Sequence, residues 1–191
     1  MTAYPDVLLV EAIIAVAIAP VIGLAIRSLR VQGALLVGFT VLSSVMHSPA
    51  AGVTLGAGAF ALAGLGAWCR AVCADRLDGI GIGVLVALSI GFGVFAAGAL
   101  AADLPTSLLN VLLITNPIVA TASAAGVDIF RGAVLYELSP IAHREFQYPA
   151  WQSSALIYAC VAVATFLVAA RAQRIRPVAS APPSHSLTRM S

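Results

Sequence analysis

The sequence predicts an all-α integral membrane protein, a polytopic bundle of about five spanning helices with a re-entrant helical hairpin on its outer face. The first observation is composition. Of the 191 residues, 61% are hydrophobic and 9% are charged, whereas soluble domains average about 25% charged residues. The second is the recurrence of apolar segments that are long enough to cross a bilayer. The third is an apolar stretch, Leu104–Trp151, that prolines and charges interrupt repeatedly. We therefore expect a multi-pass protein of the cell membrane, with the lipid bilayer as its first partner.

The expected spans are segments of about 20 predominantly apolar residues. They are Val7–Ile26, Val31–Met46, Ala51–Cys69, Gly79–Ala102 and Ser153–Ala170. The transmembrane domain is expected to cover residues 1–176, with the re-entrant region at 104–151. Residues 177–191 are rich in proline and serine and are expected to form a disordered cytoplasmic tail. The first segment is expected to be a retained span, because Asp6 and Glu11 stand where a signal peptide carries positive charge.

The arginines predict the orientation of these spans. Arginines of short loops accumulate on the cytoplasmic side. Arg27 and Arg30 follow the first expected span, Arg70 and Arg76 follow the third, and more arginines follow the last. We therefore expect the N-terminus outside and the tail inside. The link at His47–Pro49 and the interrupted stretch are then external, and His47 is expected to be an interfacial turn residue.

Within the interrupted stretch, the sequence predicts two short helices. Lipid tolerates broken backbone only where protein or water satisfies the freed amide groups. Pro105 and Pro117 each suit the first position of a helix, where a missing N–H costs nothing. Asn116 suits the cap of the second helix, because its side-chain oxygen can accept bonds from the first free N–H groups. We therefore expect one short helix from Pro105 to Ile114 and another that starts at Pro117.

The same stretch supplies candidate gate residues. The helix that starts at Pro117 is expected to end at Ser139-Pro140, so Asp128 and Arg131 lie three residues apart on one of its faces and can pair. Asn116, Pro117, Asp128 and Arg131 are therefore the candidate residues of a re-entrant gate.

Glu11 is a separate candidate. An acid inside a spanning segment is costly and is often functional. The alternative is that its carboxylate lies near the interface and reaches headgroups or water.

Paired small residues predict close helix contacts. Gly52 with Gly56, and Gly79 with Gly83, are spaced four apart, which lets helix backbones approach closely. Cys69 and Cys73 have the same spacing, but two ligands do not make a zinc site, so small apolar residues are the preferred interpretation. No acid–base pair or nucleophile set has the spacing of an active site. We expect neither enzymatic activity nor a cofactor, and no basic patch with interleaved aromatics indicates nucleic-acid binding.

The order of these features resembles the C-terminal part of type-2 ABC export permeases. The resemblance covers about Gly52 to Arg176. It rests on the segment Gly64–Arg70 with Arg76, which is a span ending in a short charged loop, on the motif Asn116-Pro117-Ile118, and on Asp128-Ile129-Phe130-Arg131.

The resemblance implies a permease subunit that exports an unknown substrate, pairs with itself or with another permease, and is driven by a separate ATPase subunit. The five spans would match the family's second to sixth. Arg27, Arg30, Arg70 and Arg76 are then the candidate residues for cytoplasmic partner contact. Two alternatives remain open. The chain can be a small membrane subunit of an ion-translocating or redox complex, with Glu11 as a proton-relay group, or a structural or assembly membrane protein.

Overall fold

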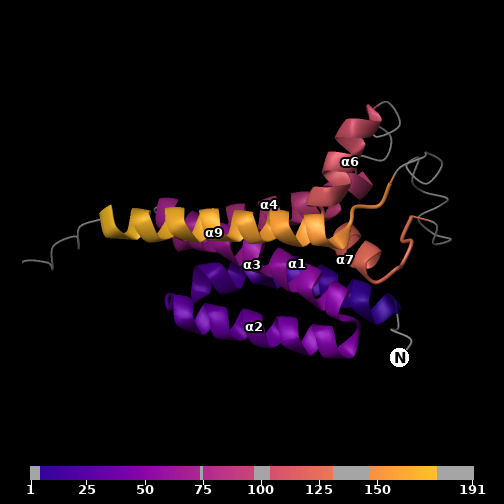
Figure 1. Cartoon of the computed structure of the whole chain (residues 1–191). Coiled ribbons are helices and arrows are strands. Elements are labelled where there is room, and N and C mark those ends of the chain that lie inside the picture. The colour runs from indigo at the N-terminus through magenta and orange to yellow at the C-terminus, as the bar shows by residue number, and fades with distance from the viewer. Residues whose placement is uncertain (1–4, 74, 97–103, 131–146, 176–191) are drawn as a thin grey trace, which may run out of the picture.

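The computed structural model describes residues 5–73, 75–96, 104–130 and 147–175, and every regular element among them is an α-helix (Figure 1). The described helices are α1 (Pro5–Ala25), α2 (Leu29–Met46), α3 (Pro49–Val72), α4 (Arg76–Ala96), α6 (Thr106–Thr115), α7 (Pro117–Ala124) and α9 (Trp151–Ile175). Five of them are long and apolar enough to cross a membrane. This architecture confirms the predicted helical bundle and fits a multi-pass membrane protein.

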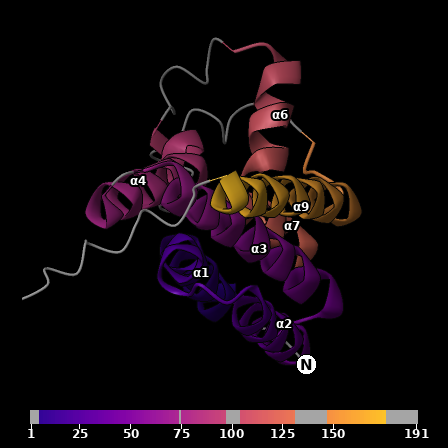
Figure 2. The same ribbon diagram turned by 90° about the vertical axis from the view of Figure 1, so that its left-hand side faces the viewer.

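Helix α3 is the centre of the bundle. It packs against α1, α2, α4, α7 and α9, and Figure 2 shows it between the α1–α2 pair and the α4–α9 pair. Most of its residues are buried, and most of those are glycine or alanine. Small side chains let the neighbouring backbones approach closely. The sequence of α3 thus explains why it, rather than a more bulky span, lies in the middle.

Glycines occupy the closest helix–helix contacts. A Cβ added to Gly66 would lie 2.0 Å from the carbonyl oxygen of Pro20 on α1. On the α2 side, a Cβ at Gly56 would lie 2.0 Å from the Thr40 hydroxyl, and one at Gly52 would meet Ser44 at 2.3 Å. The predicted tight packing at Gly52 and Gly56 is therefore confirmed, and it joins α2 to α3.

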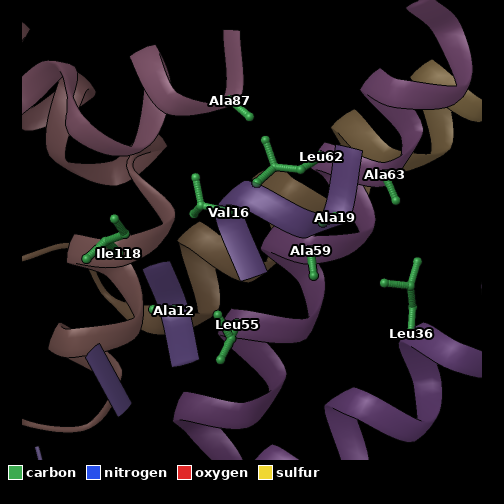
Figure 3. Packing of buried hydrophobic residues seen from close by; sticks show 10 residues of the cluster. All are labelled: Ala12, Val16, Ala19, Leu36, Leu55, Ala59, Leu62, Ala63, Ala87 and Ile118. Atoms are coloured by element: carbon green, nitrogen blue, oxygen red, sulfur yellow. The ribbon is translucent and has the colours of Figure 1, made fainter. Parts of the chain in front are cut away.

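The main apolar core lies where α1, α3, α4 and α7 meet. Figure 3 shows buried side chains from all four helices, with Leu36 of α2 at its edge. Val16 of α1 and Ile118 of α7 both approach Gly91 of α4, whose added Cβ would lie 2.8 Å from Val16 and 3.5 Å from Ile118. The short helix α7 is thus part of the core.

Contacts between helices fix their directions. Gly79 and Gly91 of α4 face Leu24 and Val16 of α1, so these two helices are antiparallel. Gly58 and Gly64 of α3 face Tyr158 and Thr165 of α9, so these two are parallel. The chain therefore leaves α4 and enters α9 at the same end of the bundle. We call this the hairpin end, since α6 and α7 lie there, and the opposite end, where α1 and α3 finish, the arginine end (Figure 1).

The predicted spans agree with the observed helices to within a few residues at the boundaries that the structure describes. The last part of the fourth expected span falls on residues 97–103, which lie outside the described residues. The expected tail at 177–191 also lies outside them. The first short helix begins at Thr106, directly after Pro105, and ends at Thr115, one residue later than expected.

Candidate functional site

The hairpin end contains a sharp break between two short helices. Helices α6 and α7 are separated by the single residue Asn116 and are bent by 84° relative to each other. Asn116 has an extended backbone, and Pro117 opens α7. Because proline has no N–H to leave unpaired, it suits this first helical position. The predicted break and the predicted second helix start are both confirmed.

The side chain of Asn116 accepts hydrogen bonds from backbone N–H groups at the start of α7. This side chain is fully buried. The side-chain oxygen accepts hydrogen bonds from the N–H groups of Ile118 at 3.0 Å and Val119 at 3.1 Å. These are two of the N–H groups that a helix start leaves without an intrahelical partner. The predicted capping role is therefore confirmed.

The amide nitrogen of Asn116 also joins the break to α4. It donates to the carbonyl oxygens of Ile90 at 3.1 Å and Gly91 at 2.9 Å. One buried side chain thus holds α7 in place and attaches it to a long helix. Both the oxygen and the nitrogen of the Asn116 side chain are thus bonded to backbone groups. Asn116 therefore serves as a positioning residue and not as a residue that binds a ligand.

Two further side chains fix the surroundings of the break. The hydroxyl of Tyr158, a buried residue of α9, donates to the carbonyl oxygen of Ile114 at the end of α6, at 2.9 Å. The hydroxyl of Ser123 in α7 donates to the carbonyl oxygen of Pro149, just before α9, at 3.0 Å. The bent pair is therefore held by α4 on one side and by the α9 segment on the other.

Helix α7 is shorter than the sequence analysis expected, which did not have the helix end before Asp128. The helix ends at Ala124, and Gly126 adopts a φ of +73°. The Gly126 N–H donates to the carbonyl oxygen of Ser123, and the Val127 N–H donates to that of Ala122. This is the Schellman pattern, in which a left-handed glycine stops a helix. Asp128 therefore does not lie on the face of a helix that runs on to Arg131.

Among the described residues, Asp128 has a partner in Tyr148. Its carboxylate accepts a hydrogen bond from the hydroxyl of Tyr148, whose ring packs against Phe130 with centroids 6.3 Å apart. This contact links the segment after α7 to the segment before α9. Arg131 lies outside the described residues, so its expected pairing with Asp128 stays a prediction.

Glu11 has a partner that sequence reasoning did not assign to it. Its carboxylate oxygen Oε2 lies 2.6 Å from Nε2 of His47, which is in the short link between α2 and α3. The His47 side chain is 3% exposed and that of Glu11 is 20% exposed. His47 is thus buried beside an acid, and it is more than an interfacial turn residue. The pair ties α1 to the α2–α3 link at the hairpin end.

The candidate contact arginines do not all point away from the bundle. Arg27 and Arg30 are exposed, but Arg70 is partly buried. Its Nη1 donates to the carbonyl oxygens of Leu24 at 3.3 Å and Ile26 at 2.6 Å. A cation suits the C-terminal end of a helix, where free carbonyl groups carry partial negative charge. Arg70 therefore caps α1. Arg76 is the first residue of α4.

Gln32 contributes to the same cap. It is buried in α2, and its amide nitrogen donates to the carbonyl oxygens of Gly23, at 3.2 Å, and Ile26. Sequence reasoning missed both Gln32 and Tyr158. The available signal was a polar residue inside an apolar span, because such a residue has to find a partner within the protein. The partner itself could not be read from the sequence.

The described residues offer packing and backbone capping rather than a ligand shell. Among them, no group of three or more His, Cys, Asp or Glu residues could hold a metal ion. The three described cysteines are free. The features that stand out chemically are the Asn116 break, the Glu11–His47 pair and the capped end of α1.

No protein-family model, curated protein or solved structure significantly matches this chain. Its function is therefore inferred from the arrangement of its own residues.

Replacing Asn116 separates its two roles. Asn116→Ala removes the cap and the bonds to α4, and it should lower the free energy of unfolding by about 3 kcal/mol because buried N–H groups lose their acceptor. Asn116→Ser keeps a capping oxygen but is too short to reach α4, so its cost should be about 1 kcal/mol. Thermal unfolding of the full chain in detergent measures both. Equal losses would assign the whole effect to the bonds with α4, and two losses near zero would show that Asn116 does not hold the break.

A double-mutant cycle measures the Glu11–His47 contact. We expect Glu11→Ala and His47→Ala together to destabilise the chain by about 1–2 kcal/mol less than the sum of the single changes, since either change alone leaves its partner without its bond. Asp6→Ala combined with His47→Ala is the control, because Asp6 is exposed on the same helix. Additive effects in the Glu11 cycle would contradict a structural pair.

Proposed function

We propose that the chain is the transmembrane permease subunit of an exporter that a separate ATPase subunit drives, as its resemblance to type-2 ABC export permeases implies. The observation that carries the proposal is the bent pair α6–α7, which is attached to α4 by Asn116 and lies at one end of the five long helices. The chain comes to this pair from α4 and continues from it into α9 at the same end, as a re-entrant hairpin requires.

A re-entrant hairpin suits the role of a gate. Broken backbone at membrane depth is tolerated where it is buried in protein or lines a cavity. Here the break is buried, and its polar groups bond to α4 and α9. Both of these helices can transmit a movement from the arginine end to the hairpin end. In this proposal, a small shift between α4 and α9 opens the hairpin end, and the Asn116 bonds keep α7 moving with α4.

The arginine end is the proposed cytoplasmic side, and the proposed location is the cell membrane. Arg27, Arg30 and Arg171 are exposed there, in agreement with the bias of cytoplasmic loops. The Arg27–Arg30 link lies directly beside the α1 terminus that Arg70 and Gln32 cap. A partner that binds this link would thus be connected to α1 and α3 through a rigid joint. The ATPase is the proposed partner at this surface, together with a second permease, identical or different.

ATP hydrolysis has to come from such a partner. No phosphate-binding loop is present in the sequence: the glycine run Gly79–Gly83 is not followed by a lysine, and it lies inside the helix α4.

One observation favours a second candidate function. The Glu11–His47 pair is a partly buried acid and base within the bundle, as a proton pathway needs. In that case the chain would be a small subunit of an ion-translocating complex. The pair lies near one end, however, and no second acid follows Glu11 along α1 toward the other end. The permease is therefore the preferred proposal.

The proposed function predicts ATP hydrolysis that depends on the exposed arginines. The full-length chain, tagged and purified in mild detergent from its own membranes, should retain an ATPase subunit and vanadate-sensitive hydrolysis. The double change Arg27→Glu and Arg30→Glu should remove both while the chain still inserts. Arg171→Glu, which reverses an exposed charge at the same end on α9, should leave them in place. A purified chain without hydrolysis above a mock preparation would contradict the permease, and so would equal loss in all charge variants.

A further inference from the structure

An apolar cavity of about 590 Å³ lies between α4 and α9. Helix α3 forms its floor through Gly58, Ala61, Leu62 and Leu65, and the last turn of α6 and Pro117 border it at the hairpin end. Gly93 of α4 leaves part of this space open, because it lines the cavity and a Cβ added to it would meet nothing within 4 Å. The volume lies within the range of roughly 300–1,000 Å³ that ligand sites occupy.

The hydroxyl groups in the cavity wall are already bonded within the protein. Ser89 donates to the carbonyl oxygen of Leu85 at 2.8 Å, Thr165 to that of Val161 at 2.8 Å, and Tyr158 to that of Ile114 at 2.9 Å. Thr115 likewise donates to Val111, at 2.9 Å. A buried water needs about two to four polar partners. The wall offers few, so its chemistry selects an apolar occupant.

The surroundings supply such an occupant. Leu85 and Val161, which both line the cavity, are 67% and 44% exposed. The cavity therefore opens toward the same side as the apolar outer faces of α4 and α9, which in a membrane face hydrocarbon. An unfilled space would forfeit the dispersion contacts of its lining atoms. A hydrocarbon chain restores these contacts and leaves no polar group unpaired.

A flexible hydrocarbon chain can follow the space between α4 and α9, whereas a helix of a second copy, which is about 10–12 Å across with its side chains, has to enter it as a rigid cylinder.

We propose that this cavity binds the hydrocarbon chain of a single-chain amphiphile, which enters from the bilayer between α4 and α9. The binding site is carried by the cavity and its lining. Its use as the substrate site, with the amphiphile as the exported class, rests on the proposed permease function. The contact of Thr115 and Pro117 with the cavity places the occupant directly beside the Asn116 break, so that binding and movement of α6–α7 are adjacent events.

The test uses the full-length chain in lipid nanodiscs and a palmitate analogue that carries a photoreactive diazirine in its chain. Gly93→Leu fills the cavity. Gly81→Leu is the matched control on the same helix, because an added Cβ there also meets nothing within 4 Å but Gly81 does not line the cavity. Both variants gain the same helix propensity, so a difference between them reports the cavity. Cross-linked residues are identified by mass spectrometry, with and without an excess of unlabelled palmitate.

The expected result is saturable labelling of lining residues from both α4 and α9. It should be displaced by unlabelled palmitate. Gly93→Leu should weaken it about ten-fold, equivalent to about 1.4 kcal/mol of binding free energy, and Gly81→Leu should leave it unchanged.

Two results would overturn the proposal. One is labelling that is equally strong on exposed faces, such as that of Val41 and Val45 on α2, and that Gly93→Leu does not change. This result would indicate contact with bulk lipid only. Disulfide cross-linking of two copies through a single cysteine placed at Ile90 or Ile157, on a background without the native cysteines, would assign the cavity to a second copy of the chain.

The labelling result, taken together with the co-purification of an ATPase, distinguishes failure of the hydrocarbon site from failure of the proposed permease function. Specific labelling in a chain that purifies without ATP hydrolysis would preserve the hydrocarbon site and reject the permease. A chain that purifies with its ATPase but is not labelled in the cavity would reject the hydrocarbon site alone.

Discussion

The buried side chain of Asn116 is the interaction on which the hairpin end depends. A helix cannot break inside an apolar bundle unless the N–H and C=O groups at the break find partners in the protein. Asn116 provides acceptors for Ile118 and Val119 and donors for the carbonyl groups of α4. Without these bonds, the first N–H groups of α7 would be buried without an acceptor, which disfavours a helix start at Pro117. Ile118 would then lose its place in the core, and the cavity between α4 and α9 would lose its border at Pro117.

The rest of the bundle is closely packed around this break. Helix α3 brings glycine and alanine to α1, α2 and α9, so these helices meet at distances where a larger side chain cannot fit. Arg70 and Gln32 fix the end of α1, and Glu11 with His47 ties its other half to the α2–α3 link. Among the described residues, the bent pair α6–α7 lies at one end of this closely packed bundle. This contrast between packed long helices and a bent pair is the physical basis of the proposed gate.

Sequence reasoning was accurate where local chemistry decides the outcome. Span length and charge located the five long helices, and Asn116-Pro117 identified the break because capping and proline geometry act over a few residues. The end of α7 was wrong, although Gly126 carried the signal of a left-handed stop. The Glu11–His47 pair joins residues 36 positions apart, and the register between two helices is set by side-chain packing that no local pattern encodes. The cavity depends on that packing as well.

The central claim is that α6 and α7 form a re-entrant hairpin and do not cross the membrane. Single cysteines at Thr106 and Gln147, both exposed, measure this directly on a background without Cys69, Cys73 and Cys160. A membrane-impermeant maleimide should label both positions from the same side, and a cysteine at Ser28 should be labelled only from the opposite side. If Thr106 and Gln147 are labelled from opposite sides, α6 and α7 form a sixth, broken span, and the gate proposed here does not exist.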